Sequence, residues 1–262
     1  MRPASGRSQA LTRPETVCPS GFPAGRLERL IEIEESHFWF AGRRSLVDRL
    51  LKRYVGVPPK TVVDLGAGAG GTAEQLAALG YQAAAVDYLP AGLQRLRART
   101  ECVHVVRSEI SPLALRDGSF DAALALDVME HVDDRAALSE VHRVLKPCGI
   151  LILTVPAFPW LWSFRDEAAH HRRRYHKAQL RQLLRNAHFR VHYLSYYQFI
   201  LFPLLMLNRL TSPRSMSRRD LEDLPSRPVN AVLGWVNRAE AHVGGWRPWG
   251  SSLVAVACRE DQ

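Results

Sequence analysis

The chain has 262 residues, of which 47% are apolar and 23% are charged. This length and this apolar content suit one large α/β domain, and they argue against disorder and against two independent cores. Lys and Arg outnumber Asp and Glu by 35 to 26, which favours anionic partners such as phosphates, carboxylates or a membrane surface, although a solvated basic face would give the same composition.

Cysteine spacing and apolar runs indicate the compartment. The four cysteines lie far apart, with no C-x-x-C pair and no metal-ligand spacing, so we expect a reducing cytoplasm. The first residues never reach an apolar core of signal-peptide length, and we expect no secretion signal. The longest apolar run, Phe199 to Leu207, is too short to cross a bilayer and contains Pro203. We therefore expect a soluble or membrane-peripheral protein.

Residues 1–25 are predicted to be a disordered tail, because Pro, Gly, Ser, Thr and Arg occur there without periodicity. Residues 26–59 carry apolar side chains at helical spacing, which predicts an N-terminal helical cap. Within it, the aromatic run 37–40 precedes Arg43. A helix placed ahead of the first strand can fold over a ligand site, where Arg43 would meet a carboxylate. The alternative is that these aromatic residues only fill the core.

An apolar run at 61–65 breaks into a group of glycines, which predicts a strand, a tight turn and a helix start. Asp64 stands two residues before the first glycine, and Asp87 ends the next apolar segment. The spacing of Asp87 suits a carboxylate on a ribose diol. Asp64 would repel a pyrophosphate but attract a sulfonium or an ammonium. The turn therefore predicts a nucleoside site for a cationic ligand and argues against a dinucleotide-dependent oxidoreductase.

Strand-like and helical segments alternate from residue 61 to residue 155, which predicts a doubly wound parallel sheet. Ligands bind at the carboxyl ends of such strands. Glu109 follows the third strand and could accept from an adenine amino group, or could be an exposed loop acid. His131 follows the fourth strand and has an ordinary pKa near neutrality, so it is a candidate general base with a packing role as the alternative.

Residues 158–250 have a different composition, and we expect them to supply acceptor-site and lid elements. An aromatic stretch and then a basic one occupy 158–175, followed by a helix at 177–187 and a strand at 189–197. Residues 199–249 are predicted to form two helical pieces inserted before the last strand at 251–258. The first piece suits a lid, a membrane-surface helix or an ordinary core helix.

Over about residues 60–157 the sequence resembles the class I S-adenosylmethionine-dependent methyltransferases. The resemblance rests on five motifs that occur in the same order as in that family, at 62–70, 87, 117–121, 127–131 and 145–151. The flanking stretches 37–44 and 171–175 look like a bacterial subset of small-molecule methyltransferases (type 11/12-like). The resemblance implies a mostly parallel, doubly wound, seven-stranded Rossmann-like sheet with helices on both faces. It also implies one methyltransferase domain at 26–262, with residues 60–157 as the cofactor-binding core.

The resemblance implies S-adenosyl-L-methionine as cofactor, S-adenosyl-L-homocysteine as product, and no metal. The acids suit a cofactor that is cationic at sulfur and at its amine. The glycines would surround the methionine part, Asp64 its ammonium, Asp87 the ribose and Glu109 the adenine, where many relatives have Asp. The implied cofactor-binding residues are Asp64, Gly66, Gly68, Gly70, Asp87, Tyr88, Glu109, Ile110, Asp127, Val128 and Arg43.

Methyl transfer is an in-line displacement, so the protein mainly aligns the acceptor and excludes water. A base is needed only if the acceptor must lose a proton, and the candidates are His131, His171 and Asp166. His170, His171 and His176 lack metal-ligand spacing. The expected acceptor-binding residues are Trp160, Trp162, Arg173, Arg174 and Tyr175. Aromatic walls with arginines suit a small-molecule or lipid-linked metabolite that is apolar and carries an anionic group.

Two other functions stay open. RNA methylation would agree with the basic charge, but the sequence shows no separate RNA-binding domain and no Asn-Pro-Pro-Tyr-type motif after the fourth strand, which argues against a nucleic-acid partner. A protein that binds the cofactor without catalysis would carry the same motifs. The sequence does not decide between a monomer and a homodimer, and peripheral contact with a membrane agrees with its composition.

Overall fold

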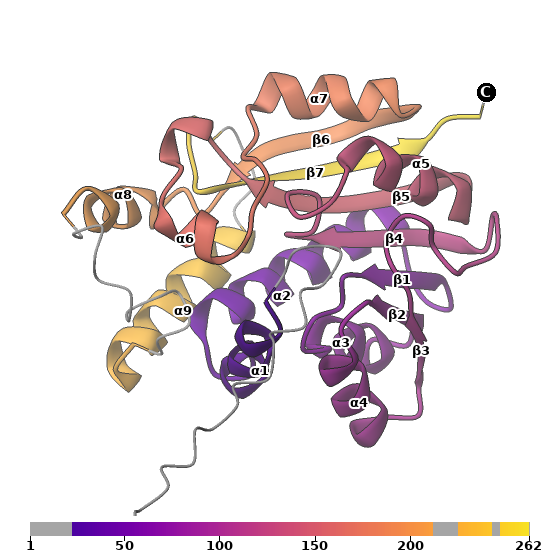
Figure 1. Cartoon of the computed structure of the whole chain (residues 1–262), viewed down its shortest axis with the longest axis horizontal. Coiled ribbons are helices and arrows are strands. Elements are labelled where there is room, and N and C mark those ends of the chain that lie inside the picture. Colours follow the sequence, from indigo (N-terminus) through magenta and orange to yellow (C-terminus); the bar gives the residue numbers. More distant parts are fainter. Residues whose placement is uncertain (1–22, 212–224, 243–246, 262) are drawn as a thin grey trace, which may run out of the picture.

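The computed structural model describes residues 23–211, 225–242 and 247–261, and it contains one seven-stranded sheet. The strand order is β3-β2-β1-β4-β5-β7-β6 (Figure 1). The first five strands pair in parallel, whereas β7 pairs antiparallel with both β5 and β6. The strands are β1 (Thr61–Leu65), β2 (Gln82–Asp87), β3 (Val103–Arg107), β4 (Phe120–Leu126), β5 (Leu145–Pro156), β6 (Phe189–Tyr197) and β7 (Ser252–Arg259).

Helices connect these strands and cover both faces of the sheet (Figure 1). The α-helices are α1 (Ala24–Ile33), α2 (Phe38–Leu50), α3 (Gly71–Ala78), α4 (Pro90–Arg99), α5 (Asp134–Val144), α6 (Phe164–Ala168), α7 (Lys177–Asn186), α8 (Phe202–Thr211) and α9 (Arg227–His242). A π-helical turn η1 (Leu51–Val55) extends α2, and a 3₁₀ turn η2 (Pro159–Leu161) precedes α6. None of the described helices is long and apolar enough to cross a membrane.

The central strands are apolar along their whole length because both of their faces are buried. In β4, Ala123 and Ala125 belong to one hydrophobic cluster together with residues of α5 and α7. Ala122, Leu124 and Leu126 point the other way, into a second cluster with α2, α3 and α4. Strands with helices on both faces are expected to lack an alternating polar pattern. This burial explains why the short alanine-rich run forms a central strand.

The predicted fold class is confirmed, with differences at element ends. The predicted tail reaches residue 25, but α1 already begins at Ala24, after Pro23 in an extended conformation; residues 1–22 lie outside the described part of the chain. The predicted helical cap consists of two helices, α1 and α2. The second helix begins after His37, which is its N-cap and accepts a hydrogen bond from Trp39 N (3.2 Å). Strand β5 begins at Leu145, directly after α5, because Leu145 pairs with Phe120.

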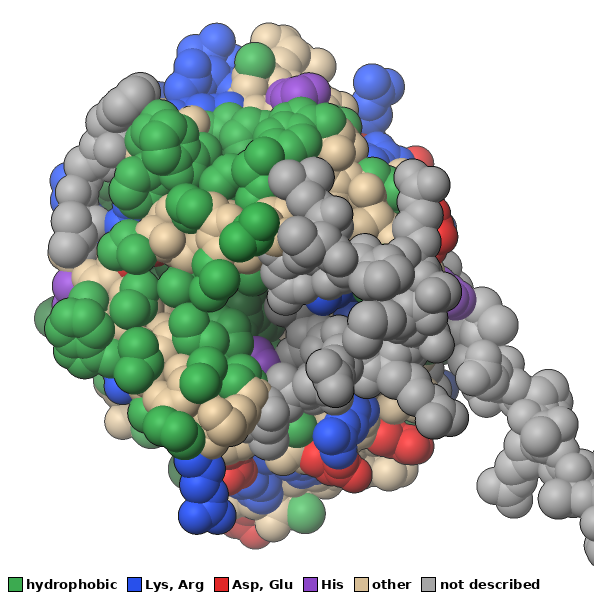
Figure 2. Space-filling model, turned by 90° about the vertical axis from the view of Figure 1, so that its left-hand side faces the viewer, with side chains coloured by type: hydrophobic (Ala, Val, Ile, Leu, Met, Phe, Trp, Pro, Cys, Tyr) green, Lys and Arg blue, Asp and Glu red, His purple; other side chains and the backbone are tan. Residues whose placement is uncertain are grey.

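The predicted insertion before the last strand is helical, as expected, and consists of α8 and α9 within the described residues. Helix α9 packs against α2: the side chain of Asn237 lies where a Cβ on Gly42 would be, and the Phe38 amide donates to Asn230 Oδ1 (2.9 Å). Helices α6, α8 and α9 lie together on one side of the molecule in Figure 1. That side carries a broad area of hydrophobic side chains (Figure 2).

Candidate functional site

A cavity of about 500 Å³ lies at the carboxyl ends of the parallel strands. Its wall includes residues that directly follow β1, β2, β3 and β4, which is the edge at which open α/β sheets bind ligands. Helices α1 and α2 close one side of it, and η2, α6 and α8 contribute the other. Pockets of this size suit a small organic ligand. The topology therefore brings the sequence motifs to one cavity.

The glycine turn after β1 forms the floor of the cavity. Gly66 has φ +69°, and a Cβ there would lie 2.5 Å from Val128 Cγ2. Gly68 has φ +56°, and its carbonyl oxygen lies 1.6 Å from where a Cβ on Gly92 of α4 would be. Side chains at these positions would clash or be strained. Both Gly66 and Gly68 line the cavity, whereas Gly70, which we expected beside them, does not.

Asp87 at the end of β2 lies in the cavity wall, where the sequence placed it. Its two carboxylate oxygens accept from Gly68 N and Leu89 N, each at 2.8 Å. Burial raises the pKa of Asp87 despite these hydrogen bonds. Tyr88, Glu109 and Ile110 line the same part of the cavity; Ile110 is buried and the Glu109 side chain is exposed. These residues form a compartment that fits a ribose and an adenine.

Asp64 does not line the cavity directly but lies behind its wall, 2% exposed. Its Oδ2 has no hydrogen-bond partner among the described residues. Burial raises the pKa of Asp64 to about 7, and the carboxylates of Glu34 and Asp87 act in the same direction against the opposing charge of Arg43. A buried carboxylate oxygen without a partner favours a cationic ligand close to it. This arrangement fits the ammonium end of S-adenosylmethionine.

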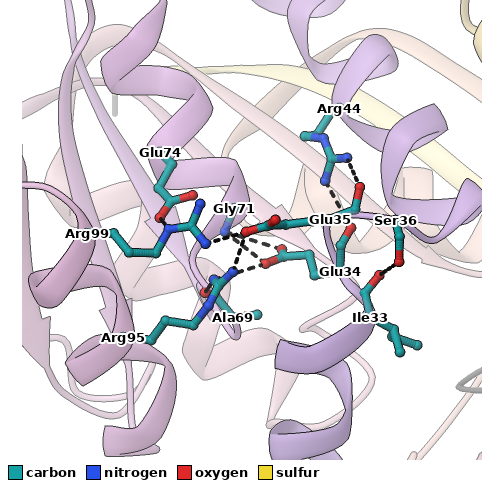
Figure 3. Close-up of polar contacts among 10 residues, drawn as sticks. All are labelled: Ile33, Glu34, Glu35, Ser36, Arg44, Ala69, Gly71, Glu74, Arg95 and Arg99. Carbon is teal, nitrogen blue, oxygen red and sulfur yellow. Dashed lines mark hydrogen bonds and ion pairs between the residues drawn. The ribbon is translucent and has the colours of Figure 1, made fainter.

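Glu34 is a cavity residue that the sequence analysis did not select. It is 3% exposed, and its carboxylate accepts from Gly71 N at the start of α3 (3.2 and 3.3 Å) and lies 3.6 Å from Arg95 (Figure 3). Burial raises the pKa of Glu34. Its neighbour Glu35 pairs with Arg95 (3.0 Å) and with Arg99 of α4 (Figure 3). These contacts hold the end of α1 over the glycine turn.

Arg43 of α2 lines the cavity, as expected, and its guanidinium pairs with Asp127 (3.3 Å) while lying 4.4 Å from the centre of the Trp39 ring. Asp127 has φ +58°, which is uncommon for a residue other than glycine and is frequent at functional sites. Thr154 donates to Asp127 Oδ1 (3.1 Å). Asp127 and Val128 both line the cavity. The end of β4 is therefore fixed from two sides, and the cap helix is joined to it.

The second half of the cavity contains a cluster of Glu130, His131 and His171, whose possible ligand atoms lie within 4.8 Å of one another. The sequence pattern had suggested no metal ligands here, yet this set could hold a cation. Burial, together with His171 and Arg26, lowers the pKa of His131 to about 3, so its ring is neutral near pH 7. Burial and the charge of Asp127 raise the pKa of Glu130 well above its ordinary range.

Asp166 and His171 are close neighbours: His171 Nδ1 lies 2.9 Å from Asp166 Oδ1. Asp166 is 1% exposed and also accepts from Ser163 N (2.9 Å) and from Arg174 Nε (2.7 Å). Arg174, predicted to bind the acceptor, lines the cavity but is held by Asp166 and by the Ala157 carbonyl (2.9 Å). Asp166 is therefore an anchor that orients His171 and Arg174.

Four predicted acceptor-binding residues do not line the cavity. Trp160 and Trp162 are 58% and 40% exposed on the outer surface. Arg173 turns to Asp134 (2.8 Å), and Tyr175 is fully buried with its hydroxyl 3.0 Å from the same carboxylate. These placements correct the sequence expectation. For Arg173 and Tyr175 the physical reason is Asp134 of α5, which attracts both side chains away from the cavity.

Other residues take their place in the wall. Leu161, Phe202, Leu205 and Met206 give it apolar surface. Arg165 lines it with a buried Nε that has no hydrogen-bond partner among the described residues, and the Arg172 guanidinium has no ion pair there either. The arginine run indicated this region, but it did not show which arginines face the cavity.

The sheet order, the glycine turn and the acids around one cavity define a Rossmann-like protein that binds a nucleoside cofactor. A family model described as a methyltransferase domain matches residues 63–153. A probable S-adenosylmethionine-dependent methyltransferase of Mycolicibacterium smegmatis is 29% identical over 181 residues, which cover 68% of this chain and 69% of that protein. A ubiquinone biosynthesis O-methyltransferase of Xanthomonas campestris is 35% identical over 106 residues, which are 38% of this chain and 44% of that protein.

Among solved structures, the protein bound to the Trm112 methyltransferase activator of Haloferax volcanii superimposes with a TM-score of 0.62 at 20% identity, covering 91% of this chain and 96% of that one. This likeness supports the fold. The methyltransferase domain and these relatives support a class I S-adenosylmethionine-dependent methyltransferase. Its cofactor is S-adenosylmethionine. The chain spans less than half of the Xanthomonas enzyme.

Proposed function

We propose that the protein methylates a hydroxyl group of an apolar metabolite that also carries an anionic group. One observation carries the proposal: a single cavity joins the glycine turn to a compartment that has apolar walls and two arginines, Arg165 and Arg172, without ion pairs in the described part of the chain. Free guanidinium groups suit a carboxylate or a phosphate. The name of the Xanthomonas relative, which specifies O-methylation in ubiquinone biosynthesis, points in the same direction.

S-adenosylmethionine, when bound, supplies an electrophilic methyl group. Asp87 and Glu109 would hold its ribose and adenine, and the glycine backbone would follow its methionine part. Asp64, from behind the wall, would favour the ammonium group through its charge rather than by direct contact. Closure by α1 and α2, which Glu34 and Arg43 fasten to the sheet edge, would exclude water from the reacting groups.

His171 is the residue we propose as general base. His131 has a pKa of about 3, so it binds a proton too weakly to take one from a hydroxyl near pH 7. In His171, the carboxylate of Asp166 lies beside Nδ1, which favours a proton on that nitrogen and leaves Nε2 to accept one. Asp166 itself is too buried and too fully bonded to reach an acceptor.

The acceptor class can be tested with cofactor that carries a labelled methyl group. The purified full chain is incubated with a lipid extract, with a water-soluble extract and with bulk tRNA. We expect label in an organic-soluble, acidic product. Labelling of tRNA alone would support the RNA alternative, which the basic composition favours, and would overturn the proposal.

A matched pair of arginine variants tests the anion site. Arg172→Gln removes a cation that faces the cavity, so we expect KM for the acceptor to rise about tenfold or more with little change in cofactor binding. Arg173→Gln is the control, because Arg173 pairs with Asp134 outside the cavity. Equal effects of the two variants would show that the anionic group is not bound at Arg172.

A further inference from the structure

One side of the molecule has an unusual concentration of exposed apolar side chains. Among the described residues, nine of the ten large hydrophobic side chains that are strongly exposed lie between positions 160 and 249. We call them the apolar face, and Figure 2 views the molecule from this side. The apolar face comprises Trp160, Trp162, Ile200, Leu204, Leu207, Val229, Val232, Trp235 and Trp249. Exposed apolar areas of this kind mark interaction surfaces.

Contacts between neighbouring elements join these side chains into one surface. Phe158 lies against both Trp160 (ring centroids 5.3 Å apart) and Phe202 of α8 (5.9 Å). Trp249 stacks on Phe199, just before α8 (5.2 Å). The backbone of Ile200 donates to Glu240 of α9 (3.1 Å). These contacts connect α9, the start of α8 and the turn at Trp160, and α8 and α9 lie on the same side of the molecule in Figure 1.

Helix α8 separates this face from the cavity. Phe202, Leu205 and Met206 line the cavity, whereas Leu204 and Leu207 are 57% and 58% exposed on the opposite side of the same helix. A single helix thus has ligand space on one side and the outer surface on the other. An apolar molecule that passes from the outer surface beside α8 would therefore enter the apolar part of the cavity.

The charges around the apolar face indicate the kind of partner that it would bind. The exposed side chains of α9 include Arg227, Arg238 and His242 but no carboxylate, and the single acid of this helix, Glu240, is buried. Arg247 lies against Glu240 (3.4 Å). Helix α8 has no acid in its sequence. Tryptophan favours the boundary between water and lipid, and cations favour anionic head groups.

We propose that the apolar face docks on a bilayer that contains anionic lipid, and that the acceptor reaches the cavity from the bilayer past α8. The docking is independent of the reaction, whereas the entry route rests on the proposed function. The side chains would lie at the level of the head groups, as those of interfacial helices do, because none of the described helices can cross a membrane.

Vesicle sedimentation of the full chain tests the docking, using phosphatidylcholine with and without phosphatidylglycerol. We expect binding to the anionic vesicles, weaker binding at high salt, and a blue shift of tryptophan fluorescence. The double variant Val232→Ser, Trp235→Ser should lower the affinity about tenfold or more. Val57→Ser is the control, because Val57 is 81% exposed and lies between η1 and β1, outside the elements that carry the apolar face.

S-adenosylhomocysteine binding, measured on the same samples, separates a failure of the docking proposal from a failure of the proposed function. Docking variants that keep full binding of this ligand have an intact cofactor site. Absence of binding to anionic vesicles by the native chain would overturn the docking. A dimer that the Val232 and Trp235 changes convert to monomer would also overturn it, by showing that a second copy covers the face.

Discussion

Replacing Asp64 by Asn should stabilise the protein and weaken cofactor binding. The carboxylate is buried, and its pKa of about 7 lies about three units above that of an unfolded chain. A raised carboxyl pKa means that the ionised form is disfavoured in the folded state. The resulting loss in the free energy of unfolding is absent below about pH 4, grows between about pH 4 and pH 7, and is constant above that. At about 1.4 kcal/mol per pKa unit, it reaches about 4 kcal/mol at pH 8.

Denaturant unfolding without cofactor at several pH values measures this cost. The free energy of unfolding of the Asp64→Asn variant should exceed that of the native chain by an amount that increases from pH 4 to pH 7. Asp121→Asn is the control with the opposite sign. Burial opposes ionisation there too, but hydrogen bonds from Lys146 and Thr61 lower the pKa of Asp121 to about 2, so its loss should destabilise the protein. A variant at Asp64 that is no more stable at any pH would refute the reasoning.

Cofactor binding should release protons from Asp64. If an ammonium group close by restores an ordinary pKa, about half a proton leaves at pH 7, and almost none at pH 8.5. Calorimetry of S-adenosylhomocysteine binding in buffers with different ionisation enthalpies measures this number. The Asp64→Asn variant should release none. Equal release by both proteins would assign the proton to another group.

Four further outcomes follow from the site. Gly66→Ala should abolish S-adenosylhomocysteine binding, because the new Cβ would lie 2.5 Å from Val128; unchanged binding would contradict this geometry. His171→Asn should lower kcat about a hundredfold, whereas His131→Asn, which changes a ring with a pKa near 3, should have a much smaller effect; the reverse ranking would make His131 the base. Glu34→Gln should loosen α1, seen as faster amide exchange in residues 24–33, with protection elsewhere as the control. Removal of divalent metal with a chelator should leave the rate unchanged; a loss restored by added metal would assign a cation to the histidine cluster.

Local patterns explain what could be predicted from the sequence. The glycine turn, Asp87 and the residues after β4 were predicted because each depends on a few neighbouring residues and on the rule that ligands bind at the carboxyl ends of strands. Glu34 was missed because its importance comes from Gly71, 37 positions along the chain. Nothing in the pattern of α1 distinguishes that carboxylate from its exposed neighbours.

The acceptor side was harder to predict because the arginine run contains residues with different partners. Arg173 and Tyr175 turn toward Asp134, and Arg174 is held by Asp166. Only Arg172 of the run has no such partner among the described residues. Ion pairs between distant elements decide which of these cations is left to bind a ligand, and sequence spacing does not contain that information.

Binding of S-adenosylhomocysteine and of NADH by the native chain and by Asp87→Ala tests the central claim most directly. Two hydrogen bonds from ribose hydroxyls to a charged carboxylate contribute about 3 kcal/mol, which corresponds to about a hundredfold in affinity. We therefore predict one S-adenosylhomocysteine site per chain, about a hundredfold weaker binding by a folded Asp87→Ala variant, and no measurable affinity for NADH. Tighter binding of NADH, or full retention of affinity by the variant, would contradict the account.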